Sequence, residues 1–521
     1  MTQDFVLDII AQGAWNGGTL VDNGMYANKG MLFKGGIPVT PESIEERIGV
    51  RTRRVAPVDA RIGVIAFQDL LESAGIDPAR IRVLIAATNV GEDKYDPGPT
   101  SLFLFERIRE FCPGALVLDL YAGCPGFNVG VEALYLLALA GMLSAGDLAV
   151  IVGAENIHRA RAFPPLDTAN IIFGDDALAT ALEIGPLAGA SAPGRVVAET
   201  AVDAGENFIE AIASALLPWA RERRLDGIVI DNQLGRVECR VPATAARVQH
   251  ALMKKLFPKE TGAGAFRNFR TAFEIYEGYK AGFAYDLMSA GGDPQTVQRI
   301  VSAYTASGRY RRLAAVFMKS GEPVRVSLID GSPGADVSAG RGVVDTLTCS
   351  HGCFADFIEA NFKHGEVYGE MDGKGVFLYA TRGAKPHLSA LLSPNRLTLG
   401  DIDLLIEHQA NFAMLPLTLE QVLADGKPPE RADVARFLAE KMVVNIHERG
   451  NCSVVCMQRL PYDLARGALA PDAIQGFPIN RNIERLKDAR LVLYDSVGAG
   501  MTRSSFLLKK QYSMQFDMRI E

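Results

Sequence analysis

The sequence has no apolar run of the length that a membrane helix needs. A membrane-spanning helix takes about 20 predominantly apolar residues, whereas the densest apolar stretch, residues 131–143, is interrupted by Glu132 and Gly141. No basic region followed by an apolar core is visible near residue 1, so no secretory signal is expected. The net charge is −7, and no basic cluster with interleaved aromatic residues appears. We therefore expect neither a membrane span nor a nucleic-acid partner.

Cysteine is also scarce, with seven residues in 521. So few thiols, one of which (Cys124) stands where a reactive thiolate is expected, indicate a reducing compartment and hence the cytoplasm. Gly498-Ala-Gly500 lacks the third glycine of a dinucleotide-binding fingerprint. Cys349, His351 and Cys353 are close in sequence, but a four-ligand metal site usually needs a second pair elsewhere. No metal, flavin or nicotinamide cofactor is expected.

The most informative residue that is present is Cys124, in Asp119-Leu-Tyr-Ala-Gly-Cys-Pro-Gly-Phe-Asn128. Residues 115–120 form a buried-strand pattern, and residues 129–145 have the composition of a buried helix. The cysteine is therefore predicted on a strand-to-helix turn, where the helix dipole and free N–H groups favour the thiolate. A lone cysteine is more often a buried structural residue; the flanking Gly123 and Gly126 and two distant partners favour a nucleophile here.

Those partners are a histidine and an asparagine far downstream. His408 stands in Glu407-His-Gln-Ala-Asn411, between a short apolar strand and a helix, and Asn451 stands in Gly450-Asn-Cys-Ser453, which opens a small-residue helix. A cysteine with a distant histidine and asparagine is suited to covalent acyl transfer. The thiolate takes an acyl group from a thioester, and the imidazole and amide hold the carbonyl of a second thioester by two hydrogen bonds.

Short β-type runs alternate with helical stretches on both sides of the chain's middle. Strands are predicted at residues 82–87, 115–120 and 147–152, with helices at 100–110 and 127–145 between them. The pattern returns as a strand at 403–406, helices at 412–423 and 430–444, and a strand at 490–495. This alternation predicts a mostly parallel sheet with both faces covered, and an approximate two-fold internal repeat.

Seven segments, in the right order, resemble motifs of the β-ketoacyl synthase III-like condensing enzymes of the thiolase superfamily. The matches lie within about residues 40–184 and 345–510. The seven segments are Glu45–Arg54, Gly123–Phe127, Ile172–Ala177, Met371–Phe377, Glu407–Asn411, Gly450–Ser453 and Val497–Met501.

This resemblance implies an α/β fold, namely a thiolase-like five-layered αβαβα core of two similar halves. The first half, with the nucleophilic cysteine, would be residues 1–184, and the second, with the histidine and asparagine, residues 341–521. The resemblance also implies a cytoplasmic homodimer whose substrates are acyl-CoA or acyl carrier protein thioesters.

The activity that the resemblance implies is that of an acyltransferase of fatty acid or polyketide biosynthesis. A decarboxylative Claisen condensation would join the acyl group on Cys124 to a malonyl-type thioester and give a β-ketoacyl thioester. His408 and Asn451 would be the other catalytic residues, and the backbone N–H groups of Cys124 and Ala499 would hold the oxyanion. The expected substrate-binding residues are Arg53, Arg54, Phe173 and Asn411. The alternatives are a non-decarboxylating condensation, of the hydroxymethylglutaryl-CoA synthase or acyl-to-acyl type, simple acyl transfer to an alcohol or amine, and a catalytically silent scaffold that binds acyl thioesters.

Residues 185–340 depart from the family, because they hold far more chain than its usual connection. Helices are predicted at 245–257, 269–290, 293–304 and 310–320, so the insertion is expected to be mainly helical. Six aromatic residues at spacings of three and four predict one helical stripe that packs on the core or caps an acyl tunnel. They are Phe266, Phe269, Phe273, Tyr276, Tyr279 and Phe283. Residues 196–205 and 342–352 are both candidates for the family's next strand, and the second is favoured.

Overall fold

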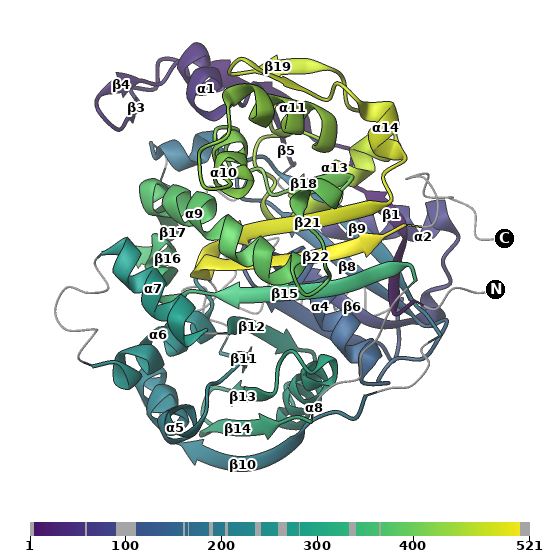
Figure 1. Ribbon diagram of the computed structural model, residues 1–521, viewed down its shortest axis with the longest axis vertical. Helices are drawn as coiled ribbons and strands as arrows, with labels where there is room; N and C mark the ends of the chain where they lie inside the picture. The colour runs from purple at the N-terminus through teal and green to yellow at the C-terminus, as the bar shows by residue number, and fades with distance from the viewer. Residues whose placement is uncertain are drawn as a thin grey trace.

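The fold is built on two β-sheets that share a layer of helices. The computed structural model describes residues 5–57, 60–89, 111–159, 162–164, 166–186, 191–203, 207–234, 241–258, 268–280, 282–332, 340–363 and 366–510. One large sheet has ten strands and the other has four. In Figure 1 the four-stranded sheet crosses the middle of the molecule, and half of the ten-stranded sheet lies below it.

The N-terminal half contributes five strands to the ten-stranded sheet. They are β1 (Leu7–Ala14), β6 (Ile81–Ala87), β7 (Leu116–Tyr121), β8 (Leu148–Glu155) and β9 (Asp176–Ile184). Their order is β1-β9-β8-β6-β7, and only β9 runs antiparallel to its neighbours. The three strands predicted in this half are confirmed. Every residue of β8 is buried, which is typical of a strand covered on both faces.

The C-terminal half forms the four-stranded sheet. Its strands are β15 (Gly342–Ser350), β18 (Leu404–Glu407), β21 (Leu491–Gly498) and β22 (Thr502–Lys509), in the order β15-β22-β21-β18. Its main helices are α9 (Gly373–Leu392), α10 (Met414–Leu423), α11 (Arg431–Lys441) and α13 (Cys456–Ala465). The predicted strands and helices of this half are confirmed, within a few residues at their ends.

Five layers result from the packing of these elements. Helix α2 (Ile62–Ala74) covers the outer face of the first half's strands, and α4 (Gly126–Leu139) and α13 lie between the two sheets. Helix α9 covers the outer face of the four-stranded sheet. The expected αβαβα core of two similar halves is therefore confirmed. Helix α4 is buried along its whole length and ends earlier than predicted, because Gly141 turns the chain with φ +69°. The helix predicted at 100–110 lies outside the described residues.

The insertion contains five strands that the sequence analysis did not predict, so the expectation of a mainly helical insertion is corrected. The strands are β10 (Arg195–Val202), β11 (Gly227–Asn232), β12 (Phe283–Ser289), β13 (Arg312–Met318) and β14 (Val324–Asp330). The helices are α5 (Phe208–Glu222), α6 (Thr244–Leu256), α7 (Phe269–Tyr279) and α8 (Pro294–Tyr304). These strands continue the first half's sheet in the order β7-β12-β11-β13-β14-β10.

Two of the predicted helices of the insertion are wrong for a common physical reason. The segment predicted as a helix at 310–320 is strand β13, and the helix predicted at 269–290 ends at Tyr279, after which the chain enters β12. Both strands are buried at every position, and the periodicity of a short, fully buried apolar run does not distinguish a strand from a helix. The predicted aromatic stripe is therefore divided between α7 and β12, and Phe266 lies outside the described residues.

Smaller elements surround this core. They are β2 (Thr19–Asp22), β3 (Leu32–Phe33), β4 (Ile37–Pro38), α1 (Pro41–Ile48), β5 (Thr52–Val55), β16 (Ile358–Lys363), β17 (Glu366–Met371), α12 (Ile446–Arg449), β19 (Asp472–Ile474), β20 (Phe477–Ile479) and α14 (Ile483–Lys487). Among the helices of the described ranges, none combines the length and apolar character needed to cross a bilayer.

Candidate active site

Cys124 occupies the predicted turn between β7 and α4, in contact with the loop that closes the C-terminal half. Gly123 has φ +69°, and a Cβ added there would lie 2.5 Å from the backbone nitrogen of Ala499. A Cβ added at Gly498 would lie 2.4 Å from the backbone nitrogen of Cys124. Side chains at either glycine would therefore force the two loops apart. This close approach places the Ala499 backbone beside the Cys124 turn, and the oxyanion role of their two N–H groups stays a prediction.

The pKa of the Cys124 thiol is raised above its ordinary value, contrary to the expectation of a lowered pKa. Burial raises the pKa of Cys124 to about 12, and the hydrogen bond from Ser453 Oγ to Sγ, at 3.3 Å, acts in the opposite direction. Desolvation disfavours the charged form of any buried group, and here it outweighs the helix N-terminus.

Asn451 lies next to the same serine. Its backbone N–H donates to Ile172 O at 2.8 Å, and its side-chain Oδ1 accepts from the backbone N–H of Ser453 at 2.7 Å. The asparagine amide and the Cys124 thiol are thus both hydrogen-bonded to Ser453. Because Oδ1 is engaged in this way, the Nδ2 donor is turned away from Ser453 and is available to a substrate carbonyl.

His408 follows β18 directly and is buried with a neutral ring. Its backbone N–H donates to Asp495 O of β21 at 2.9 Å, and burial lowers the pKa of the imidazole to about 4. Neither ring nitrogen has a hydrogen-bond partner among the described residues. Leaving a buried polar group unpaired costs about 1–3 kcal/mol. A neutral imidazole of this kind is suited to donate to a ligand oxygen.

Gln409 fixes the histidine loop against the asparagine segment. Its backbone N–H donates to Cys456 Sγ at 3.4 Å, and its Nε2 donates to Val443 O at 2.7 Å. Its Oε1 accepts from the backbone N–H groups of Asn445 and Ile446, each at 3.1 Å. Since Asn451 follows this segment by a few residues, the fold brings the predicted His408 and Asn451 motifs together.

The sequence analysis missed a hydrogen-bonded chain that leads from the thiol to a buried carboxylate. Asn89 Nδ2 donates to Ser453 Oγ at 2.8 Å and to Glu155 Oε1 at 2.7 Å. Asn89 and Glu155 stand at the carboxyl ends of the adjacent parallel strands β6 and β8, where functional side chains of α/β sheets gather. That position is the sequence signal that would have identified them.

Three of the four predicted substrate-binding residues lie at the site or at the surface. Phe173 forms a β-bridge with Asn451 and stacks on Phe163, with 5.5 Å between ring centroids. Asn411 accepts a hydrogen bond from the backbone N–H of Ala413 at 2.9 Å, just before α10. Arg54 is half-buried and donates to Gly17 O at 3.1 Å. Their contact with a substrate stays a prediction.

Arg53 does not fit the role predicted for it. Its side chain is fully buried, donates to Asn23 Oδ1 at 2.8 Å, and lies over the Tyr26 ring, 5.0 Å from the centroid. A guanidinium enclosed in this way has no surface to offer to a nucleotide phosphate. Arg53 is enclosed and Arg54 is half-buried because successive side chains of strand β5 point to opposite faces.

Glu277, Cys349 and His351 form a cluster whose ligand atoms lie within 4.8 Å of one another. The two partners of the histidine, however, are on opposite sides of its ring, since Glu277 Oε1 is 2.9 Å from Nε2 and Cys349 Sγ is 3.9 Å from Nδ1. A metal ion takes one ring nitrogen of a histidine, so these groups do not converge on one ion.

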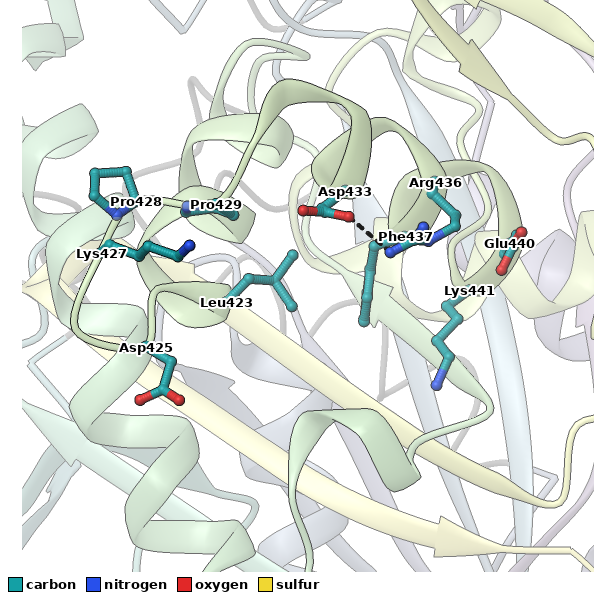
Figure 2. A pocket seen from close by; sticks show the side chains of 10 residues that line it. All are labelled: Leu423, Asp425, Lys427, Pro428, Pro429, Asp433, Arg436, Phe437, Glu440 and Lys441. Carbon is teal, nitrogen blue, oxygen red and sulfur yellow. Dashed lines mark hydrogen bonds and ion pairs between the residues drawn. The ribbon is translucent and has the colours of Figure 1, made fainter.

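A cavity of about 430 Å³ lies between the end of α10 and α11. Figure 2 shows that charged side chains of both signs surround it, among them the ion pair of Asp433 and Arg436 at 2.7 Å. None of its lining residues belongs to the cysteine, histidine or asparagine motif. The cavity is therefore distinct from the candidate active site.

The chain resembles known proteins in part of its sequence. No family model matches the chain. A β-ketoacyl-[acyl-carrier-protein] synthase III of Nitratidesulfovibrio vulgaris (strain DP4) is 29% identical over 189 residues, which cover 34% of this chain and 48% of that protein. The protein of the same name from Cereibacter sphaeroides is 23% identical over 277 residues, 51% of this chain and 72% of that one. The chain spans about half the length of the first of these relatives.

Solved structures give the same fold. The 3-oxoacyl-[acyl-carrier-protein] synthase III of Aquifex aeolicus superposes with a TM-score of 0.53 at 14% identity, over 97% of this chain and 100% of that chain. The corresponding protein of Pseudomonas aeruginosa has a TM-score of 0.51 at 18% identity, over 98% and 99%. At such identities the likeness shows the fold. The chain is a thiolase-fold protein related in sequence to the β-ketoacyl-[acyl-carrier-protein] synthase III condensing enzymes.

Proposed function

We propose that the chain is an acyltransferase that condenses an acyl group carried on Cys124 with a malonyl-type thioester. The observation that supports this proposal is that Ser453 joins the cysteine and asparagine motifs, while Gln409 ties the histidine loop to the segment before Asn451. Cys124 and Asn451 are both bonded to Ser453, and His408 has a neutral ring without a partner among the described residues. A cytoplasmic location is part of the proposal, because a reactive thiol is kept reduced there.

The first step is acylation of the thiol. The sulfur of Cys124 attacks the carbonyl of an acyl thioester, the carrier thiol leaves with the proton, and the acyl group is held as a new thioester. The backbone N–H groups of Cys124 and Ala499 stabilise the negative oxygen of the intermediate. Donors aimed at a developing oxyanion in a dry site are worth about 10²–10³ in rate each.

The second step joins the two chains. The carbonyl oxygen of a malonyl-type thioester accepts hydrogen bonds from the His408 imidazole and the Asn451 Nδ2. Loss of carbon dioxide leaves an enolate, whose charge these two donors stabilise. The enolate carbon attacks the Cys124 thioester and expels the Cys124 thiolate, which takes a proton from water; the products are a β-ketoacyl thioester and the free enzyme. None of these steps needs a cofactor; the carrier, CoA or a carrier protein, comes with the substrate.

A second candidate function is a non-decarboxylating condensation of two acyl thioesters. The observation that favours it is the buried Glu155, which is linked to the thiol through Asn89 and Ser453. Such a reaction must remove a proton from carbon, and a carboxylate close to the thiol is the base that it requires.

The products of a single turnover test the proposal and separate the two functions. Enzyme acylated from acyl-CoA is given either malonyl-CoA labelled in its free carboxylate or a second acyl-CoA. Release of labelled carbon dioxide with formation of a β-ketoacyl thioester in the first mixture supports decarboxylative condensation. A β-ketoacyl product only in the second mixture supports the alternative, and acyl transfer to an added alcohol or amine alone rejects both. The same panel supplied on a carrier protein distinguishes the donor, and an enzyme that binds these thioesters without becoming acylated would be a scaffold.

A further inference from the structure

The insertion repeats the strand arrangement of the N-terminal half. The order β7-β6-β8-β9-β1 in that half corresponds to β12-β11-β13-β14-β10 in the insertion. The strand senses agree as well, because β14, like β9, is antiparallel to both of its neighbours, and β11, like β6, is parallel to both. Helices α5 and α8 follow the first and third strands of the insertion, as α2 and α4 follow those of the first half.

An irregularity in the first strand of each unit supports a common origin. In β1 the register shifts between Ile9 and Ala11, and in β10 it shifts between Val196 and Ala198. Strand β15 of the C-terminal half has the same shift between Val343 and Asp345. In all three the shift is against the last strand of the unit, namely β9, β14 and β22. A β-bulge is a specific feature that is kept within a fold rather than a random defect. The chain thus contains three copies of one half-fold, where two were expected.

The first half and the insertion meet along a local two-fold axis. Strand β7 pairs antiparallel with β12, with Leu120 opposite Leu287. Tyr121 lies opposite Asp286, and Asp119 lies opposite Met288. If Leu120 and Leu287 occupy equivalent positions in the two copies, so do Asp119 and Asp286, and so do Tyr121 and Met288. The pair of Tyr121 with Asp286 is then equivalent to the pair of Met288 with Asp119. This reciprocity is the mark of an isologous contact between two like subunits.

The inserted copy has lost the nucleophile. The residue that follows Leu287 at the distance at which Cys124 follows Leu120 is Gly291. The chain there runs Gly291-Gly292-Asp293, where the first half has Cys124-Pro125-Gly126. The described residues contain one C-terminal half, and its histidine and asparagine motifs belong with Cys124 rather than with this copy. The inserted copy is therefore not a second active site.

The inserted copy instead supports the closing loop of the first one. A Cβ added at Gly500 would lie 3.5 Å from the Cβ of Ala246 in α6. Glu277 of α7 is bonded to His351 Nε2 at 2.9 Å, and the backbone N–H of His351 donates to Met501 O at 3.0 Å. Residues 499–501 therefore lie between the inserted module on one side and the Cys124 turn on the other.

We infer that the inserted module occupies in the same chain the place of a second subunit, so that one copy forms a complete enzyme. The edge of β7 would otherwise present unpaired N–H and C=O groups, which invite pairing with another chain. In this protein β12 fills that edge. The homodimer expected from the family resemblance is therefore not needed at this edge. On the side of the insertion the sheet now ends at β10, where Val197 is 55% exposed.

The full-length protein tests this inference by light scattering combined with acylation kinetics. Mass and the rate of Cys124 acylation per mole are measured over the same range of dilutions, for the natural sequence and for Val197→Lys at the new edge. A mass near 56 kDa with a constant specific rate supports the inference. A dimer that Val197→Lys converts into an equally active monomer supports it too.

Two outcomes overturn the inference. One is a specific rate that falls as a dimer dissociates. The other is a dimer that persists in both proteins at every dilution. The acylation arm rests on the proposed function, whereas the mass does not. A monomer that no substrate acylates would therefore contradict the proposed chemistry and leave the role of the module supported.

Discussion

Ser453 Oγ donates a hydrogen bond to Cys124 Sγ, at 3.3 Å, across a sequence separation of 329 residues. The bond joins the asparagine motif to the nucleophile and is the one described side-chain contact of the thiol that lowers its pKa. In a buried site such a bond is the means by which a thiolate is stabilised when it forms.

Ser453→Ala should therefore slow every reaction of the thiolate. A hydrogen bond to a charged group contributes about 1.5–3 kcal/mol, so the alkylation rate of Cys124 at neutral pH should fall by roughly 10- to 100-fold. The rate of alkylation by iodoacetamide against pH measures this, with the exposed Ser393→Ala as the control. An unchanged profile in Ser453→Ala would show that the bond does not act on the thiolate.

His408→Ala and Asn451→Ala should impair decarboxylation and condensation far more than acylation. We place both donors on the carbonyl of the second thioester, where the loss of one donor costs about 10²–10³ in rate. Burst acylation and release of carbon dioxide are measured separately, and His447→Gln, in the same segment as Asn451, is the control. Equal loss of both steps in the two variants would contradict this division of roles.

The pH dependence of condensation should show no titration of His408 above pH 5. Burial lowers its pKa to about 4, so the ring is neutral from there upward. An inflection near pH 6.5, seen with pre-acylated enzyme and absent in His408→Gln, would contradict a neutral donor. The same lowered pKa determines how the free energy of unfolding changes with pH. An unfolded histidine binds its proton below about pH 6.5, so the contribution of His408 to the free energy of unfolding is full above that pH and declines toward pH 4.

Glu277→Ala should weaken the support of the closing loop. Burial alone would lower the pKa of His351, but Cys349 and Glu277 raise it to about 9, and the ring also meets Tyr379 OH at 2.8 Å. Without Glu277 we expect the maximal acylation rate to fall by roughly tenfold, with KM unchanged, as the oxyanion donor shifts. Glu274→Ala, three residues earlier on α7 and exposed, is the matched control. Equal maximal acylation rates in the two variants would show that the inserted module does not support the closing loop.

Glu155→Gln decides between the two candidate reactions. The amide keeps an oxygen that can accept from Asn89, so the geometry is retained while the base is removed. Decarboxylative condensation should keep most of its rate. A non-decarboxylating reaction should lose about 10²–10⁴, the usual contribution of a general base. The single-turnover rates with the two kinds of second substrate measure the difference.

The catalytic motifs and the core could be predicted from the sequence because their signals are local. Strands β6, β7 and β8 are short apolar runs bounded by turn residues, and Cys124, His408 and Asn451 stand beside glycines or at strand ends. The fold then brings these motifs together by pairing strands that are distant in sequence. Asn89 and Glu155 carry no such local signal apart from their places at strand ends, and Ser453 was singled out only as part of the asparagine motif, so their hydrogen-bonded chain became visible only in three dimensions.

The errors have physical causes of their own. Strands β12 and β13 were predicted as helices because a fully buried run has no polar face to reveal its period. The pKa of Cys124 was predicted from the helix dipole, whereas burial, which the sequence does not show, dominates. Arg53 was predicted to bind substrate from its place in the early basic motif, yet it is enclosed over Tyr26. The third copy of the half-fold is evident from strand order and bulges rather than from sequence identity.

The most direct test of the account is the mass of the intact protein after incubation with a panel of acyl-CoA and acyl carrier protein thioesters. The account predicts the addition of one acyl group, placed on Cys124 by peptide mapping, absent in Cys124→Ser, and discharged when malonyl-CoA or malonyl carrier protein is added. Acylation that persists in Cys124→Ser at another residue, or no acylation from any donor of the panel, would contradict it.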